Sequence, residues 1–264
     1  MQGFGSALIT GASSGIGEAL ALALAAPGVR LHLSGRDAKR LRAVAGACRA
    51  RDATVLPMVI DVREAGAMAA WIGGAGQLDL VVANAGISAG TSDHAAESAA
   101  QTRAIFATNL DGVLNTVLPA MTVMAEQPLG PDGVRGCIAV IASIAAFVAS
   151  PGAPAYCASK AAVDAWTVAS AYGARQRGIS LTSVCPGYVR TGMTAQNSFP
   201  MPGLMDAQRA ARIILDGVAE GRVRVAFPWW MASAARLAGL LPPRLLGWLL
   251  ARQPGKPADP ALIC

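Results

Sequence analysis

Short apolar segments alternate with longer amphipathic segments along most of the chain. Seven apolar segments are continuous, as in parallel strands covered on both faces, and they span residues 7–10, 29–34, 54–60, 78–83, 137–142, 180–184 and 223–227. Helical spacing fills the intervals, at residues 15–26, 37–50, 64–73, 97–126, 156–177 and 206–220. Because strands and helices that alternate in this way form right-handed βαβ units, the pattern predicts an α/β fold: a doubly wound parallel sheet of about seven strands flanked by helices.

Two internal segments depart from this rhythm. Residues 127–136 are rich in Pro and Gly and predict a surface loop before the fifth strand. Residues 191–205 are irregular, and their length is typical of a mobile loop over a substrate. Since doubly wound sheets bind ligands at the carboxyl ends of their strands, we expect the functional site there.

The C-terminal extension, residues 229–264, is dominated by apolar side chains. Two short helices are predicted at 231–241 and 244–251, followed by an extended tail with three prolines at 253–264. Three interpretations stay open: the extension covers the substrate site or a subunit interface, lies on a membrane surface through its tryptophans and arginines, or only adds a packed layer. We expect a single domain at 1–228, with an extension that is not an independent domain.

Composition narrows the classes of function. The chain has 264 residues, of which 53% are apolar and 14% charged, so it can bury a large core. Its net charge of +6 comes mostly from arginines that are spread out without a polybasic run, which disfavours nucleic-acid binding. No signal-peptide pattern opens the chain, and no stretch of 18 uninterrupted apolar residues predicts a membrane-spanning helix. We therefore expect a cytoplasmic protein, possibly peripheral to the membrane.

Cysteine and histidine usage argues against disulfides and metal sites. The five cysteines are widely spaced and form no CxxC pair: Cys48, Cys137, Cys157, Cys185 and Cys264. This pattern indicates a reducing compartment, and two histidines offer little to a metal. Cys157 adjoins Tyr156, and a packed thiol is a commoner role for it than redox chemistry.

A glycine-rich turn joins the first predicted strand to the first helix. Its residues have the spacing GxxxGxG, and the candidate binding residues are Gly11, Ser13, Ser14, Gly15, Ile16 and Gly17. Glycines permit a tight turn and a close ligand, and the free N–H groups of a helix N-terminus attract a pyrophosphate. The turn therefore predicts dinucleotide binding, although a purely structural corner has the same composition.

The second strand ends in Gly35, Arg36 and Asp37, where the adenosine ribose of a dinucleotide would lie. NAD sites place a carboxylate against the ribose hydroxyls, whereas an arginine can neutralise the 2′-phosphate of NADP. Arg36 therefore favours NADP(H) over NAD(H). Two points stay open: Arg36 is alternatively a solvated residue at a helix start, and Asp37 either caps the next helix or faces the ribose.

Tyr156 and Lys160 are four residues apart, so they lie one turn apart on the same side of a helix. An ammonium group near a phenol stabilises the phenolate and lowers its pKa, which makes the pair a plausible proton-transfer device. The spacing alone is equally typical of a half-buried tyrosine beside a solvated lysine. The other motifs of the chain favour the functional interpretation.

Together these features resemble the short-chain dehydrogenase/reductase family in its classical, single-domain form, which has a Rossmann-like fold. Order and spacing match from about residue 5 to residue 192. The matching motifs are 10–17, Asp61-Val62, Asn84-Ala85-Gly86, Asn109, Ser143, Tyr156-x-x-x-Lys160 and Pro186-Gly187-Tyr188-Val189-Arg190-Thr191. One departure is the 127–136 loop, which lengthens the interval between Asn109 and Ser143 and could shift an oligomer contact.

The resemblance implies a role for each cofactor-binding residue. Asp61 would contact the adenine ring, with Val62 beside it. Asn84, Ala85 and Gly86 would line the cofactor groove and steady the central sheet. The nicotinamide end would pack on or hydrogen-bond a last group: Pro186, Gly187, Val189 and Thr191.

The resemblance also implies four catalytic residues. Ser143 would hold the substrate carbonyl, and Tyr156 would be the general acid in reduction and the general base in oxidation. Lys160 would bind the nicotinamide ribose and depress the pKa of Tyr156. Asn109 would hold a water that connects Lys160 to solvent. Simpler roles exist for some of them, since Ser143 could satisfy backbone groups and Asp61 could cap the following helix.

The sequence therefore predicts an NADP(H)-dependent oxidoreductase that transfers a hydride between nicotinamide and a carbonyl or alcohol substrate. An NAD-linked alcohol or hydroxysteroid-type dehydrogenase is the alternative within the same class. A catalytically silent dinucleotide-binding regulatory protein is the alternative from another class. The resemblance implies a homodimer or homotetramer formed through the helices at 97–126 and 156–177. A lipid-like substrate would suit a membrane-bound extension.

Overall fold

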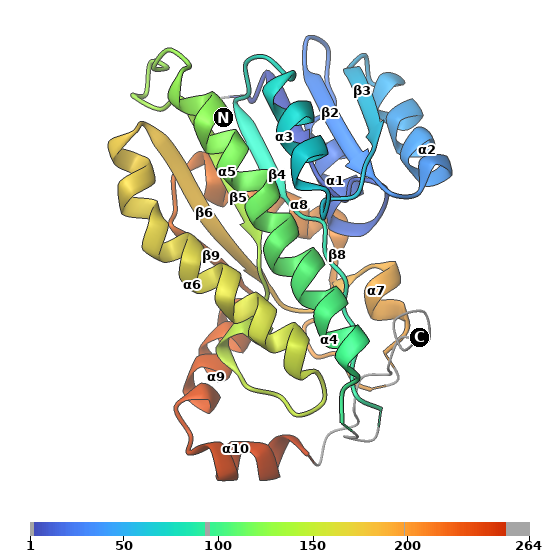
Figure 1. Ribbon diagram of the computed structural model, residues 1–264, viewed down its shortest axis with the longest axis vertical. Helices are drawn as coiled ribbons and strands as arrows, with labels where there is room; N and C mark the ends of the chain where they lie inside the picture. Colours follow the sequence, from blue (N-terminus) through green and yellow to red (C-terminus); the bar gives the residue numbers. More distant parts are fainter. Residues whose placement is uncertain (1–2, 93–95, 198, 252–264) are drawn as a thin grey trace.

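One parallel sheet of seven strands runs through the residues that the computed structural model describes, 3–92, 96–197 and 199–251 (Figure 1). The strand order is β3-β2-β1-β4-β5-β6-β9, and every neighbouring pair is parallel. The strands are β1 (Ser6–Ile9), β2 (Arg30–Gly35), β3 (Thr54–Val59), β4 (Leu80–Ala83), β5 (Gly136–Ile141), β6 (Ile179–Pro186) and β9 (Arg224–Phe227). The predicted α/β fold class is confirmed.

Helices cover both faces of the sheet. One face carries α1 (Gly15–Leu24), α2 (Ala38–Arg49) and α8 (Ala207–Ala219), and the other carries α3 (Ala65–Gly73), α5 (Gly112–Ala125) and α6 (Pro154–Gln176). In Figure 1, α3, α5 and α6 lie in front of the sheet, with α1 and α8 behind it.

The continuous apolar strands follow from this double cover. In β1, Ala7 and Ile9 pack into the core under α1 and α8, whereas Leu8 between them packs into the core under α3 and α5. Successive side chains of a strand point to opposite faces, so a strand covered twice needs apolar residues at every position.

The long helix predicted at 97–126 is interrupted. It consists of α4 (Ala99–Phe106), a π-helical turn η1 (Ala107–Asp111) and α5. Asn109 lies in this turn, whose backbone hydrogen bonds join residues five apart instead of four. Turns of this kind are common at functional sites.

The segment predicted to be irregular at 191–205 contains some regular structure. Two short strands, β7 (Val189–Arg190) and β8 (Met205–Asp206), pair in parallel, and α7 (Gly192–Ala195) follows β7. A short 3₁₀ turn, η2 (Ile144–Phe147), follows Ser143 and was not predicted.

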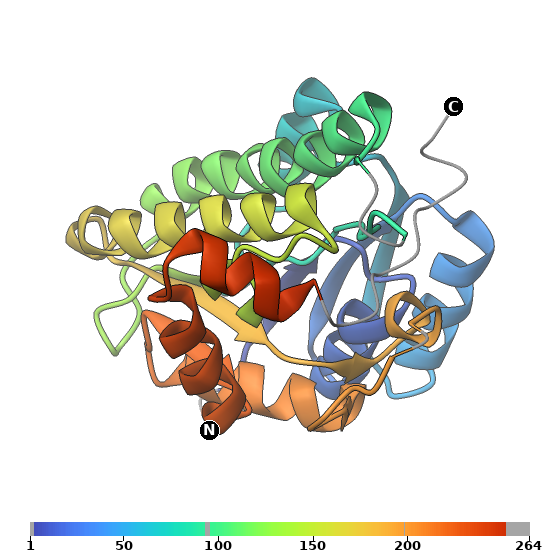
Figure 2. The ribbon, with the colours of Figure 1, turned by 90° about the horizontal axis from the view of Figure 1, so that it is seen from below.

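The two helices predicted in the extension are present as α9 (Trp229–Gly239) and α10 (Pro243–Leu250). Figure 1 shows them together at the lower end of the molecule, past the end of β9, and Figure 2 shows this end from below. The tail predicted at 253–264 lies outside the described residues. In the part of the chain that the structure describes, no helix combines the length and hydropathy that a membrane crossing requires.

The order of the strands reverses between β1 and β4, because the chain passes from β1 outward to β3 and then returns to the other side of β1. The loops that follow β1 and β4 therefore diverge and leave a crevice at the carboxyl edge of the sheet.

Candidate active site

A cavity of about 570 Å³ lies at this carboxyl edge, within the range of small-molecule and cofactor sites, roughly 300–1,000 Å³. We call the part lined by the loops after β1, β2 and β3 the glycine end. The part lined by Ile144, Val148, Tyr188, Ala235 and Leu250 is called the apolar end. Eighteen predicted site residues line the cavity: Gly11, Ser13, Ser14, Gly15, Ile16, Arg36, Asp61, Val62, Asn84, Ala85, Gly86, Ser143, Tyr156, Lys160, Pro186, Gly187, Val189 and Thr191.

The two remaining predicted residues, Gly17 and Asn109, support the cavity from behind. A Cβ atom on Gly17 would overlap the carbonyl oxygen of Gly11 and lie 2.6 Å from Nδ2 of Asn84. Asn109 is fully buried. Both positions hold lining residues in place instead of lining the cavity themselves.

The turn after β1 fits a dinucleotide. Gly11 and Gly15 have φ angles of +64° and +62°, a backbone conformation that favours glycine. Ser14 is the N-cap of α1, and its side chain makes no capping hydrogen bond. The first-turn N–H groups of α1 are therefore free of a side-chain cap and can bind a phosphate.

At the end of β2, the two roles left open for Asp37 are now distinguished. Its carboxylate accepts hydrogen bonds from the backbone N–H groups of Lys39 and Arg40, both at 3.0 Å, so Asp37 caps α2. Arg36 and Arg40 both line the cavity. The Arg40 guanidinium also pairs with the Asp37 carboxylate at 3.2 Å. Two guanidinium groups therefore lie at the end of β2, where the ribose of a dinucleotide would lie.

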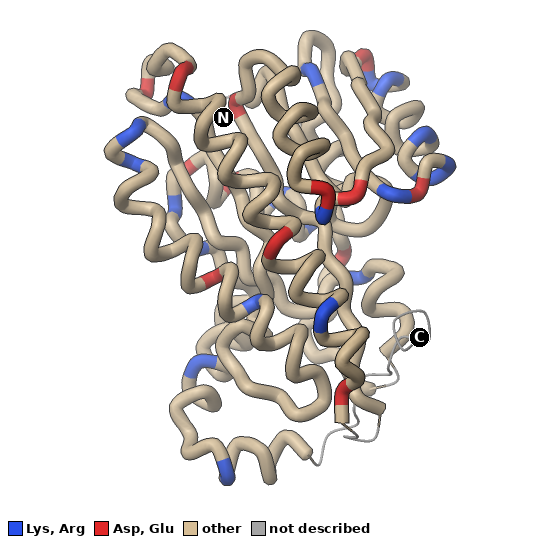
Figure 3. Tube along the Cα trace, in the orientation of Figure 1, with Lys and Arg blue, Asp and Glu red and all other residues tan. Residues whose placement is uncertain are grey.

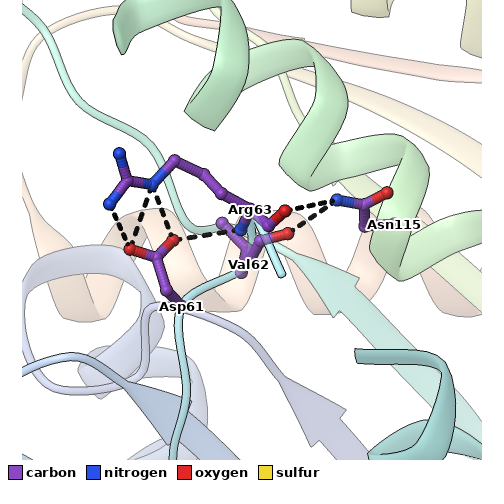
Figure 4. Close-up of polar contacts among 4 residues, drawn as sticks. All are labelled: Asp61, Val62, Arg63 and Asn115. Carbon is purple, nitrogen blue, oxygen red and sulfur yellow. Dashed lines mark hydrogen bonds and ion pairs between the residues drawn. The ribbon is translucent and has the colours of Figure 1, made fainter. Parts of the chain in front are cut away.

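Asp61 forms an ion pair with Arg63 at the rim of the cavity (Figure 4). Arg63 donates from Nη2 at 2.7 Å, from Nε at 3.0 Å and from its backbone N–H at 3.0 Å. These bonds lower the pKa of the Asp61 carboxyl. Asp61 does not cap α3, whose N-cap is Glu64. The adenine contact of Asp61 stays a prediction.

Asn84 ties the loops after β1 and β4 together. Its Nδ2 donates to the carbonyl oxygens of Thr10 at 3.0 Å and Gly11 at 3.1 Å. In return, Oγ1 of Thr10 accepts from the backbone N–H groups of Asn84 at 3.0 Å and Ala85 at 3.2 Å. Asn84 therefore braces the crevice at the switch point of the sheet.

Tyr156, Lys160 and Ser143 meet between the two ends of the cavity. Tyr156 and Lys160 lie in the first two turns of α6, and Ser143 lies two residues after the end of β5 and caps η2. The Ser143 side chain hydrogen-bonds Tyr156, and its Oγ also accepts from the N–H of Ala145 at 3.1 Å. Lys160 Nζ donates to the carbonyl oxygen of Ile141 at 2.7 Å and lies 5.9 Å from the centre of the Tyr156 ring.

Burial sets the protonation of this group. It raises the pKa of Tyr156 to about 12, with Ser143 acting in the opposite direction, and it lowers the pKa of Lys160 to about 8. Desolvation of the phenolate outweighs the hydrogen bond from Ser143, and the depression of the Tyr156 pKa by Lys160 that the resemblance implied stays a prediction. At neutral pH Tyr156 carries its proton and Lys160 is mostly cationic.

Asn109 links α6 to the loop after β4. Its Oδ1 accepts from the N–H of Ile87 at 2.8 Å, and its Nδ2 donates to Ile87 O at 2.9 Å and to Ser159 Oγ at 3.1 Å. Ser159 lies between Tyr156 and Lys160 on α6. Since both amide hydrogens of Asn109 are used, its side chain acts as a brace, and the water that it would hold stays a prediction.

The segment after β6 closes the cavity opposite Ser143. The N–H of Gly187 donates to Phe227 O at 2.7 Å, and Thr191 caps α7, where its N–H donates to Thr194 Oγ1 at 3.0 Å. These bonds fix Pro186, Val189 and Thr191 along one wall. The contact of this wall with a nicotinamide stays a prediction.

One cysteine, Cys157, is part of the cavity lining. Cys157 is a buried free thiol whose pKa is raised by burial, as expected for a packed residue. In residues 3–92, 96–197 and 199–251, no group of His, Cys, Asp and Glu side chains is arranged to hold a metal.

Several contributors were not found from the sequence. Thr10 opens the 10–17 motif but was given no role of its own, and Arg63 directly follows the Asp61-Val62 motif. Ala235 and Leu250 lie in the extension, where no motif applies. Their place in the cavity depends on how α9 and α10 pack.

Known proteins resemble this chain in sequence. A family model described as short chain dehydrogenase matches residues 6–200. An uncharacterized oxidoreductase of Myxococcus xanthus (strain DK1622) is 37% identical over 241 residues, which are 90% of this chain and 92% of that protein.

Solved structures agree. A short chain dehydrogenase/reductase from Burkholderia phymatum in complex with NAD has a TM-score of 0.77 at 25% identity, covering 96% of this chain and 97% of that chain. A short-chain dehydrogenase from Sphingobium yanoikuyae in complex with NADPH has a TM-score of 0.76 at 23% identity, covering 89% and 94%, and this likeness concerns the fold.

Proposed function

This chain belongs to the short-chain dehydrogenase/reductase family of oxidoreductases, which act on CH–OH groups with NAD(P), and on that premise we propose that it reduces a carbonyl substrate with NADPH. The observation that carries the proposal is the meeting of Tyr156, Ser143 and Lys160 in a cavity whose glycine end fits a dinucleotide. The substrate is a ketone or aldehyde, and the product is the corresponding alcohol.

When bound, the nicotinamide supplies the hydride. Tyr156 Oη and Ser143 Oγ donate hydrogen bonds to the carbonyl oxygen, where negative charge develops. Tyr156 then gives its proton to that oxygen, and its pKa of about 12 keeps the proton available at neutral pH. Lys160, a buried cation 5.9 Å from the ring centre, stabilises the resulting phenolate.

The remaining predicted residues would hold the cofactor. The turn of Gly11 to Gly17 and the N-terminus of α1 would bind the pyrophosphate, and Asp61 and Val62 the adenine. Asn84, Ala85 and Gly86 would shape the groove, with Lys160 on the nicotinamide ribose. Pro186, Gly187, Val189 and Thr191 would contact the nicotinamide. We assign cofactor binding and catalysis to residues 1–228.

Preference for NADP(H) over NAD(H) rests on Arg36 and Arg40. Both line the cavity at the end of β2, and the carboxylate of Asp37 is occupied as the cap of α2. A ribose 2′-phosphate would find two guanidinium groups there.

The test titrates the purified chain with NADPH and NADH separately, followed by nicotinamide fluorescence and then by turnover with a panel of ketones and aldehydes. We expect tighter binding of NADPH, and Arg36→Ala should weaken NADPH binding at least ~10-fold while leaving NADH unchanged. Tighter NADH binding would favour the NAD-linked dehydrogenase. Binding of either cofactor without any turnover would favour the catalytically silent regulatory protein.

We further propose self-association and contact with a lipid surface. Leu118 on α5 and Tyr172 on α6 expose 51% and 77% of their surface, which suits a homodimer or homotetramer formed through these helices. The outer faces of α9 and α10 expose tryptophans and leucines together with arginines and no acidic residue (Figure 3), which suits an anionic membrane and a lipid-like substrate. Light scattering and sedimentation with anionic liposomes test the two contacts.

A further inference from the structure

Helix α9 contacts the segment after Ser143 more closely than a side chain would allow. A Cβ atom on Gly239, at the end of α9, would overlap the carbonyl oxygen of Phe147. Phe147 is the last residue of η2, the turn that Ser143 caps. The end of α9 thus touches the backbone four residues beyond a catalytic side chain, and only glycine fits this contact.

Two arginines flank the same phenylalanine. The guanidinium carbon of Arg236, one turn before Gly239, lies 4.6 Å from the centre of the Phe147 ring, and that of Arg224 lies 5.7 Å from it. Guanidinium groups at such distances attract the face of an aromatic ring. Phe147 therefore joins α9 to the end strand β9.

The contacts of Phe147 continue through Arg224 into α6, the helix that carries Tyr156 and Lys160. Arg224 donates to the carboxylate of Asp164 from Nε at 2.9 Å and from Nη2 at 2.8 Å. Asp164 is 5% exposed, also accepts from Ser183 Oγ at 2.6 Å, and follows Lys160 by one turn of α6. This bidentate, partly buried pair holds its geometry firmly, so the position of α9 is fixed relative to α6, the helix of Tyr156.

The extension, held at Phe147 in this way, also forms part of the apolar end of the cavity. Ala235 of α9 and Leu250 of α10 line it, as do Ile144 and Val148, which lie before and after Phe147 in the sequence. The position of α9 therefore sets the distance between Ser143 and the far wall.

We propose that Phe147, Arg236 and Gly239 form a joint that fixes α9 and α10 as one wall of the catalytic cavity, and that Ala235 on this wall limits the size of the apolar group that a carbonyl substrate carries. The joint stands on geometry alone, whereas the role of Ala235 rests on the proposed function. With its oxygen at Ser143 and Tyr156, a substrate directs its larger substituent to the apolar end, where the small Ala235 leaves room.

The joint is tested without turnover, by hydrogen–deuterium exchange of the full chain. In Gly239→Ala, the amides of 229–250 should exchange at least tenfold faster, while those of α1 and α2 keep their rates. Gly247→Ala on α10 is the matched control, because a Cβ there meets no atom within 4 Å. Arg236→Gln should give a smaller change in the same segment. Native-like exchange of α9 in Gly239→Ala would overturn the joint.

The wall is tested by substrate size. Ala235→Leu should raise KM for a ketone with a bulky apolar substituent about tenfold more than for a small aliphatic ketone. Ala234→Leu, on the exposed side of α9, is the matched control. An equal loss for both ketones would overturn the role of Ala235. If the native chain reduces no carbonyl, the proposed function and the role of Ala235 both fail, and exchange alone decides the joint.

Discussion

The glycine end of the cavity is built around main chain and glycines of the loops after β1, β2 and β3, whereas the apolar end is built from side chains of segments up to about a hundred residues apart. At the glycine end, Gly11 and Gly17 each meet a neighbour that leaves no room for a Cβ, and Gly15 has a positive φ. At the apolar end, Ile144, Val148, Ala235 and Leu250 need only supply volume. A site made of backbone restricts residue type strictly, and a site made of apolar walls restricts mainly size.

Tyr156→Phe should produce the largest effect and should separate the two ends. Removing the phenolic hydroxyl abolishes proton transfer, so kcat for carbonyl reduction should fall ~10²–10⁴-fold, whereas NADPH affinity, set at the glycine end, should stay within about twofold. Stopped-flow turnover and nicotinamide fluorescence measure the two quantities.

Tyr172→Phe is the control for this change, because Tyr172 is on the same helix and 77% exposed. It should leave both quantities unchanged. Loss of NADPH binding in Tyr156→Phe would mean that the two ends are not separable.

Gly17→Ala should damage the glycine end alone. The added Cβ overlaps Gly11 O and crowds Asn84, so we expect NADPH affinity to fall about tenfold or more and stability to fall by ~1–3 kcal/mol. Gly46→Ala, in α2 with no atom within 4 Å, should instead stabilise by about 0.5–1 kcal/mol. Urea unfolding with NADPH titration compares them, and native affinity in Gly17→Ala would contradict the strictness of this end.

The pH dependence should reveal the buried ammonium group between the two ends. Lys160 has a pKa lowered to about 8, so its charge is present below pH 8 and is lost as the pH rises through that value. We expect kcat/KM for NADPH, which reports the free enzyme, to be halved near pH 8 and to fall roughly tenfold per unit above it.

Tyr156 and Cys185, each with a pKa of about 12, keep their protons through this range. A profile that is flat between pH 7 and pH 10 would show that the Lys160 charge is not needed or is not lost.

The smallest effect is expected on the outer face of the extension. Leu240 is 81% exposed, so Leu240→Ala should change the free energy of unfolding by less than ~0.5 kcal/mol and leave turnover unchanged. Leu246→Ala, on the buried side of α10, should cost about 2 kcal/mol or more. A large cost for Leu240→Ala in urea unfolding would mean that this face is covered in an assembly.

The difference between the ends also explains what sequence reasoning could find. Continuous apolar runs such as Val81 and Val82 predicted the strands, because a strand covered twice has no polar position. Tyr156, Ser143 and Asn84 were identified by their spacing, and the structure brings them to one cavity. The effect of burial on the Tyr156 pKa could not be predicted, because it depends on everything packed around the ring. The contact of Gly239 with Phe147 leaves no local signal, since it joins positions almost a hundred residues apart.

The π-helical turn at Ala107–Asp111 is wider than an α-helical turn and lies within one long helix. Its buried residues, Thr108 and Asn109, lie between the buried Ile105 of α4 and the buried Val113 of α5. A turn of this kind holds one residue more than an α-helical turn, so a single-residue deletion here would convert it to ordinary α-helix and would move Asn109 away from its partners Ile87 and Ser159. Chain length in this short window is as strictly specified as residue identity at Asn109.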